Sequence, residues 1–179
     1  MNHIDEATIA ALTDYYREVL PPGGAILDLM SSWVSHLPAD VAFGRVAGLG
    51  MNREELAANP RLGEFCVHDL NRHPALPHDS ESFDAVLCAV SIQYLTRPVE
   101  VFADVRRVLR PGGISIVAMS HRCFPTKAVR AFHVLPRDGR LELVATYHAL
   151  AGGFETPMRL DRSPMGADPL WIVTARRRA

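Results

Sequence analysis

Short apolar runs alternate along this chain with longer stretches whose apolar residues recur at helical spacing. Seven runs have the length of buried strands, namely residues 25–29, 46–49, 64–67, 83–89, 114–119, 155–160 and 170–175. Strands that alternate with helices assemble into an open sheet with helices on both faces. The pattern therefore predicts a three-layer, doubly wound α/β fold, and such sheets bind ligands beyond the carboxyl ends of their strands.

Proline, glycine and capping residues set the limits of the predicted helices. A helix over residues 5–20 ends at two prolines and two glycines, so residues 1–22 form a lead-in segment. Asn52 and Glu55 have the spacing of a capping box and begin another helix. The other helical segments are a stretch after the first strand, residues 98–110, residues 127–134, and residues 139–150, which Asp138 would cap.

The length and charge of the chain limit the classes of function. A chain of 179 residues buries roughly 70% of its unfolded surface, so we expect residues 1–179 to form a single domain. With 19 basic and 20 acidic residues, it has no general attraction to nucleic acid or anionic membranes. No apolar run approaches the roughly 20 residues of a membrane span, and the acidic first residues are unlike a signal peptide. These features predict a cytoplasmic protein.

The cysteines and histidines lack the spacing of a metal site. Cys66, Cys88 and Cys123 lie far apart in or beside apolar segments, which favours reduced, buried thiols. The histidines at positions 68, 73 and 78 recur at an interval that suits neither one helical face nor a tight loop chelate. The sequence therefore predicts no bound metal.

Residues 83–113 carry the most specific motif of the chain. An apolar run that begins with Phe83 and Asp84 is followed by a helical segment, by Arg-Pro-Gly-Gly at 110–113 and by another apolar run. At this spacing the segment resembles the Rossmann-like S-adenosylmethionine-dependent methyltransferases of the type 11 group. The similarity runs from about Leu20 to the end of the chain. It implies a seven-stranded, mostly parallel sheet with an antiparallel last strand near residues 168–174, and S-adenosylmethionine as the cofactor.

Two positions depart from the pattern of that family. Where members usually have a glycine-rich turn after the first strand, this chain has Met-Ser-Ser-Trp at 30–33. Where members have an acidic residue after the second strand, to bind the ribose hydroxyls, this chain has Gly50. Asp69 matches the family residue that binds the adenine amino group. The resemblance thus implies a cofactor site with an altered first loop.

The residues expected to bind the cofactor are Asp28, Met30, Ser31, Ser32, Trp33, Asn52, Asp69, Leu70 and Ala89. Each polar residue among them also has a structural interpretation. Asp28, Ser31 and Ser32 would cap the segment that follows the first strand, and Asn52 would cap its own helix. Trp33 would pack in the core, and Asp69 would form a turn.

Catalytic candidates lie after the fourth and fifth strands. Methyl transfer requires mainly that donor and acceptor be held in line, and a base only when the acceptor must lose a proton. Tyr94 would present a phenol to the acceptor, His121 would act as a general base and Arg122 would bind an acidic group. The alternatives are a core tyrosine and solvated loop residues.

Together these features predict a methyltransferase that transfers the sulfonium methyl of S-adenosylmethionine to a small molecule. The alternative is a methyltransferase-like domain that has lost the donor site and serves as a binding or assembly module. Glycine loss at residues 30–33 and Gly50 itself favour that alternative. The short chain leaves little room for a substrate lid, which a partner or a second copy in a homodimer would supply.

Overall fold

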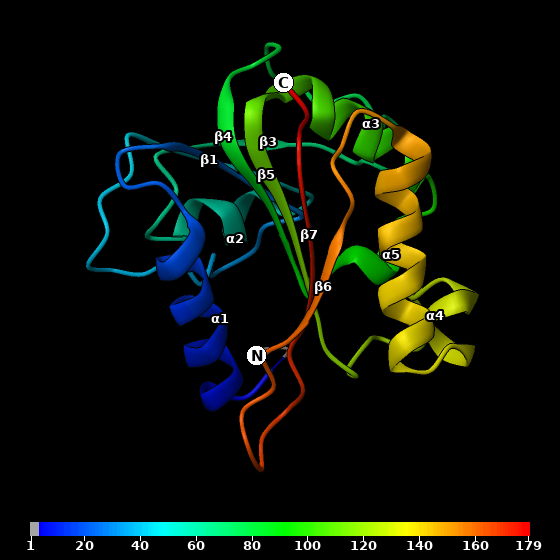
Figure 1. Ribbon diagram of the computed structural model, residues 1–179. Coiled ribbons are helices and arrows are strands. Elements are labelled where there is room, and N and C mark those ends of the chain that lie inside the picture. The colour runs from blue at the N-terminus through cyan, green and yellow to red at the C-terminus, as the bar shows by residue number, and fades with distance from the viewer. Residues whose placement is uncertain (1–3) are drawn as a thin grey trace.

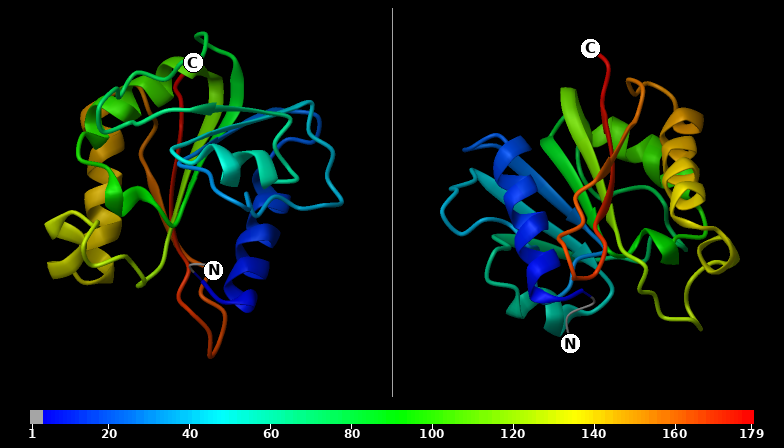
Figure 2. Two further views of the ribbon diagram at one scale, coloured as in Figure 1. Left: turned by 180° about the vertical axis from the view of Figure 1, so that it is seen from behind. Right: turned by 60° about the horizontal axis from the view of Figure 1, so that its bottom comes forward.

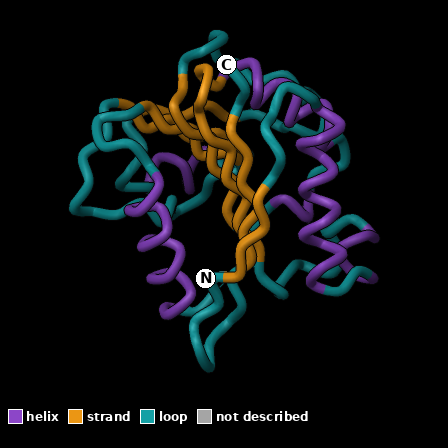
Figure 3. The backbone as a smooth tube through the Cα atoms, viewed as in Figure 1, coloured by secondary structure: helices purple, strands orange, loops and turns teal. Residues whose placement is uncertain are grey.

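The computed structural model describes residues 4–179, so the first three residues of the expected lead-in segment lie outside it. Its strands are β1 (Ala25–Leu29), β2 (Arg45–Gly50), β3 (Glu64–Val67), β4 (Phe83–Ala89), β5 (Leu109–Met119), β6 (Met158–Asp161) and β7 (Trp171–Arg176). The strands, orange in Figure 3, lie together in one sheet. It has seven strands in the order β3-β2-β1-β4-β5-β7-β6. β7 runs antiparallel to both of its neighbours and the other pairs are parallel, which confirms the predicted fold class.

The central strands are buried on both faces. Every residue of β1 is buried, and so are most residues of β4 and β5. Parallel strands covered by helices on both sides read as continuous apolar runs rather than as alternating ones. This is why the strand pattern was visible in the sequence.

Helices cover both faces of the sheet (Figures 1 and 2). The helices are α1 (Glu6–Val19), α2 (Arg53–Ala58), the 3-10 helix η1 (Ile92–Tyr94), α3 (Pro98–Val108), α4 (Arg130–Val134) and α5 (Arg137–Ala151). Leu12 and Tyr16 of α1 pack on one face, in a cluster with Ile26, whereas Val105 of α3 and Val144 of α5 pack on the other. None of these helices is long and apolar enough to cross a membrane.

The stretch after β1 is a loop, so the helix predicted there is wrong. Residues 30–44 contain no helical segment, and Met30 and His36 have positive φ angles of 55° and 56°. The Asn59 side chain donates hydrogen bonds to the Ser32 carbonyl (2.8 Å) and the Ser35 hydroxyl (2.9 Å). Because left-handed residues interrupt a helix and a side chain satisfies the loop polar groups, the segment stays irregular.

Other predicted limits also differ from the structure. The helix expected over residues 127–134 is α4 (Arg130–Val134), and the strand expected over residues 155–160 is β6 (Met158–Asp161). α3 ends at Val108, and Leu109 already belongs to β5, where it pairs with Phe83 before the register shifts. Gly112 and Gly113 therefore lie within the irregular first part of β5. α5 begins after Pro136, so Asp138 lies in its first turn and is not the cap. Proline suits the helix start because it lacks an N–H to be satisfied.

Candidate functional site

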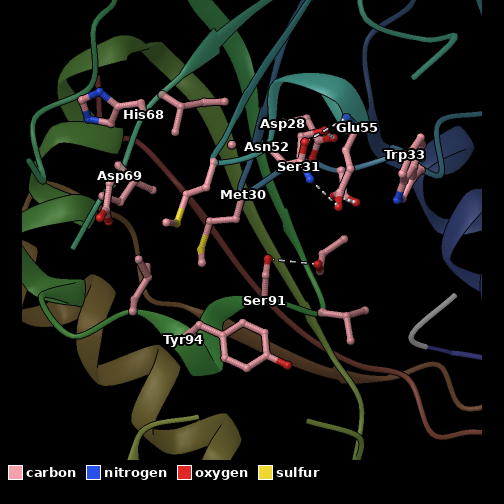
Figure 4. A pocket seen from close by; sticks show the side chains of 18 of the residues that line it. Asp28, Met30, Ser31, Trp33, Asn52, Glu55, His68, Asp69, Ser91 and Tyr94 are labelled. Carbon is pink, nitrogen blue, oxygen red and sulfur yellow. Dashed lines mark hydrogen bonds between the residues drawn. The ribbon is translucent and has the colours of Figure 1, made fainter. Parts of the chain in front are cut away.

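A cavity of about 550 Å³ lies beyond the carboxyl ends of β1, β2, β3 and β4. Its volume falls within the roughly 300–1,000 Å³ of small-molecule sites. Its walls include all nine residues expected to bind the cofactor, and also Tyr94. Figure 4 shows Asp28 and Ser31 on one side of this cavity, His68 and Asp69 on the other, and Met30 between them. The loops after four neighbouring strands thus meet at one place.

Asp28 is the most deeply buried acid of the cavity wall, with 3% of its surface exposed. The Ser31 hydroxyl donates a 2.6 Å hydrogen bond to its Oδ2. Burial raises the Asp28 pKa to about 6, although hydrogen bonds from the Ser31 and Ser35 hydroxyls oppose the rise. Asp28 therefore fastens the first loop through the Ser31 hydroxyl while it also lines the cavity, but it does not cap a helix, because none follows β1.

The backbone is strained just after two of the strands that border this cavity, β1 and β4. Met30 follows β1 with φ 55°, and Val90 follows β4 with φ 50°. For a β-branched residue such as valine, the left-handed region is an outlier, and such strain often gathers at binding sites. Met30 occupies the turn where a glycine would enter this region without cost.

Gly50 and the first loop depend on each other. The Ser31 N–H donates to the Leu49 carbonyl at 2.8 Å, which draws the loop onto the end of β2. A Cβ at Gly50 would overlap the carbonyl oxygen of Ser31 and press on Leu56. The two departures from the family pattern are therefore one structural change, because this course of the loop leaves no space for a side chain at position 50.

Glu55 supplies a carboxylate to the cavity that sequence analysis treated only as a capping residue. Its Oε2 accepts a 2.5 Å hydrogen bond from the Ser32 hydroxyl, and its Oε1 accepts one from the Asn52 side chain at 3.0 Å. Asn52 Oδ1 accepts the backbone N–H groups of Glu54 and Glu55, so its capping role is confirmed. The capping-box spacing was the only signal for Glu55, and it concealed the position of the carboxylate beside the cavity.

Asp69 lies on the opposite wall, after β3. Its Oδ1 accepts the Asn71 N–H at 2.9 Å, and its Oδ2 lies 3.6 Å from Arg72 Nε. This is the turn that its structural interpretation expects. Leu70 beside it is buried, and His68 Nε2 contacts the His73 carbonyl at 2.7 Å. The turn and the position in the cavity wall are compatible, because a carboxylate accepts several hydrogen bonds.

Trp33 and Tyr94 also line the cavity. Trp33 is 50% exposed, so the prediction that it packs in the core is wrong. The Tyr94 hydroxyl accepts a 3.0 Å hydrogen bond from the Phe124 N–H, and the two rings stack with centroids 6.1 Å apart. The Tyr94 phenol is thus held in position and still has its own proton to donate.

The structure places His121 and Arg122 away from the cavity wall. Arg122 donates through Nε to Asp168 Oδ1 at 3.1 Å, and His121 Nε2 lies 3.8 Å from the same oxygen. Asp168 also accepts the Asp5 N–H at 2.9 Å, so this cluster joins the loop before β7 to the start of α1. Figure 1 shows that loop beside the first described residues. The catalytic role of His121 and Arg122 stays a prediction.

Comparison with known proteins agrees with the fold and the cavity. Residues 32–117 match a family model described as a methyltransferase domain. No curated protein matches the chain in sequence. An S-adenosylmethionine-dependent methyltransferase from Mesorhizobium loti is 20% identical, with a TM-score of 0.65 over 94% of this chain and 98% of that one.

Two further solved structures share the fold. The cyclase SpnF has a TM-score of 0.70 and 20% identity over 94% of this chain and 81% of that one. The phosphoethanolamine N-methyltransferase 2 of Haemonchus contortus, in complex with S-adenosyl-L-methionine, has a TM-score of 0.67 and 16% identity over 95% of this chain and 52% of that one. Residues 32–117 thus match the methyltransferase-domain family, and the chain as a whole has the Rossmann-like methyltransferase fold.

Proposed function

We propose that the protein transfers the methyl group of S-adenosylmethionine to a small molecule in the cytoplasm, with residues 1–179 as one domain. The observation that carries the proposal is the cavity itself, whose walls bring together Asp28, Asp69 and the other residues expected to bind the cofactor. Methyl transfer is also the activity for which its family is named.

The residues present fit the cofactor, although not in the usual way. Asp69 and Leu70 would hold the adenine, while Asn52 and Glu55 offer an amide and a carboxylate for the ribose hydroxyls in place of a side chain at Gly50. Asp28 and the loop that it fastens would face the methionine part. When bound, the cofactor supplies an activated methyl group, and the task of the protein is to hold the acceptor in line with it.

Tyr94 is the residue that we propose beside the acceptor. Its ring is fixed by the stack with Phe124 and its hydroxyl by the Phe124 N–H. A fixed phenol orients an acceptor through a hydrogen bond at little entropic cost. A second copy of the chain in a homodimer would close the open side of the cavity.

The alternative function is a binding or assembly domain that has lost the donor site. One observation favours it: the polar groups of the first loop already have partners inside the protein. Ser31 bonds to Asp28, Ser32 bonds to Glu55, and Asn59 bonds to the Ser32 carbonyl. A ligand would have to share or replace these hydrogen bonds, which reduces what it gains on binding.

Titration calorimetry with S-adenosylmethionine and its demethylated product separates the two functions. For the methyltransferase we expect saturable heat from both ligands and a rise in melting temperature with ligand concentration. The absence of both heat and thermal stabilisation at millimolar ligand would contradict the methyltransferase function. The alternative function, a binding or assembly domain, would then remain. Once binding is measured, a methyl-release assay over metabolite pools identifies the acceptor.

A further inference from the structure

Exposed apolar side chains gather around the cavity. Four of the residues that line it are large, apolar and exposed, namely Trp33 (50%), Val34 (44%), Met51 (70%) and Phe124 (48%). Single exposed apolar residues are normal on protein surfaces, but a group of them around one cavity marks a site for an apolar ligand or partner. We call these four residues the apolar rim.

The only lysine of the chain lies beside this rim. All other basic residues are arginines, and Lys127 lines the same cavity, with its Nζ 5.6 Å from the centre of the Phe124 ring. Within residues 4–179, no carboxylate oxygen lies at ion-pair distance from the Lys127 ammonium. The contact with an aromatic face leaves the ammonium donors available to an anion.

The acidic residues of the cavity do not neutralise this ammonium. The three carboxylates that line the cavity each have a partner of their own: Ser31 for Asp28, Ser32 for Glu55 and Arg72 for Asp69. Lys127 therefore presents its positive charge beside the apolar rim and has no ion-pair partner among residues 4–179. An apolar rim beside an uncompensated cation is complementary to a ligand that has an apolar body and one negative group.

We propose that the methyl acceptor is a small apolar anion. Its ring or alkyl body packs against Trp33, Met51 and Phe124, and its carboxylate, sulfonate or phosphate group pairs with Lys127. The proposal deepens the proposed function and rests on it, because it assigns the rim to the acceptor and the deeper wall to the cofactor. Trp33 thereby moves from the residues expected at the cofactor to those at the acceptor. Tyr94, which stacks on Phe124, then lies between the two.

Two fluorescent probes that differ in one group test the pairing of charge and apolar surface. Anilinonaphthalenesulfonate is an apolar anion, and N-phenylnaphthylamine has the same rings without the sulfonate. We expect the wild-type protein to bind the anion more tightly, with an affinity that falls as salt rises. Lys127→Met should lower the affinity for the anionic probe about fivefold, as the loss of one exposed ion pair would. The affinity for the neutral probe should not change.

Matched variants distinguish the effect of the Lys127 charge from that of the positive charge of the surface in general. Arg130→Met removes an exposed cation three residues away that does not line the cavity, and it should alter neither probe. Lys127→Arg should keep the preference for the anion. Trp33→Ala should lower the affinity for both probes to the same extent. The proposal would be overturned if wild type and Lys127→Met bound the anionic probe with equal affinity. It would also be overturned if Lys127→Met lost affinity for both probes to the same extent.

A ligand competition distinguishes failure of this proposal from failure of the proposed function. The demethylated cofactor product is titrated into protein that already holds the anionic probe. If the product binds and the probe stays, both proposals are supported. If the product displaces the probe, the rim belongs to the donor site and the acceptor assignment falls. If the product does not bind at all, the methyltransferase function falls, while the probe affinities still decide whether an apolar anion is recognised.

Discussion

The carbonyl oxygen of Ser31 fills the space that a Cβ at Gly50 would need. The Ser31 N–H is bonded to the Leu49 carbonyl, so the loop after β1 lies directly on the end of β2. An acidic side chain at position 50 is incompatible with this course of the loop. Glu55, from the helix that follows, lines the same cavity and supplies a carboxylate there.

Gly50→Ala should destabilise the protein by about 1–3 kcal/mol, because the added Cβ must displace the Ser31 backbone. The measurement is urea unfolding at neutral pH. Gly63→Ala is the control, since its Cβ would make an ordinary contact with the Val46 carbonyl. If Gly50→Ala and Gly63→Ala change the free energy of unfolding by the same amount, the loop can move away from position 50. The conclusion that the loop and Gly50 depend on each other would then be wrong.

Asp28→Asn should stabilise the protein near pH 7. The folded pKa of Asp28 is raised to about 6, above its ordinary value, so ionisation of this buried carboxyl costs stability as pH rises through that range. The cost in the wild type is at most about 3 kcal/mol and vanishes below the unfolded pKa near pH 4. Urea unfolding at both pH values should show a gain for Asp28→Asn that is present at pH 7 and absent at pH 4. A gain of equal size at both would refute this.

His148 should make the protein sensitive to mild acid. It is fully buried beside Phe102, with Nδ1–H donating to the Val144 carbonyl and Nε2 accepting from the Ser115 hydroxyl. Burial lowers its pKa to about 4, so the neutral form is the folded one.

The stability contributed by a neutral His148 is complete above the unfolded pKa and is lost as pH falls. We expect a loss of about 2 kcal/mol by pH 5. His148→Gln should be less stable than wild type at pH 7, and the difference should shrink by about that amount at pH 5. Urea unfolding at the two pH values measures it, and a difference that does not change with pH would contradict the titration of this imidazole.

Asp69→Ala should weaken binding of S-adenosylmethionine about tenfold without unfolding the domain, because it removes the carboxylate expected at the adenine. Calorimetry measures the affinity, and a melting curve confirms the fold. Arg72→Ala is the matched control, since it removes the ion pair of Asp69 and leaves the carboxylate in place. Unchanged affinity in Asp69→Ala would remove the adenine assignment.

Much of the fold was predictable because its strands are buried on both faces and its helices carry apolar residues at regular spacing. Val101, Val105 and Val108 of α3 are buried, and they recur at the helical spacing on which the predicted helix over residues 98–110 rests. The loop at residues 30–44 was not predictable in this way. Its course depends on Asn59, which lies far along the chain and donates to the Ser32 carbonyl and the Ser35 hydroxyl.

The sequence by itself determined most of the alternation of strands and helices, because it follows from local patterns. Its motif spacing pointed to the methyltransferase fold and to nine of the residues that line the cavity. The tertiary structure alone decided what the first loop does. It joined Ser31 to Gly50, brought Glu55 beside Ser32, and paired Arg122 with Asp168 at a distance from the cavity. Hydrogen bonds and close contacts between residues far apart in the chain depend on how the layers pack, and no local pattern records them.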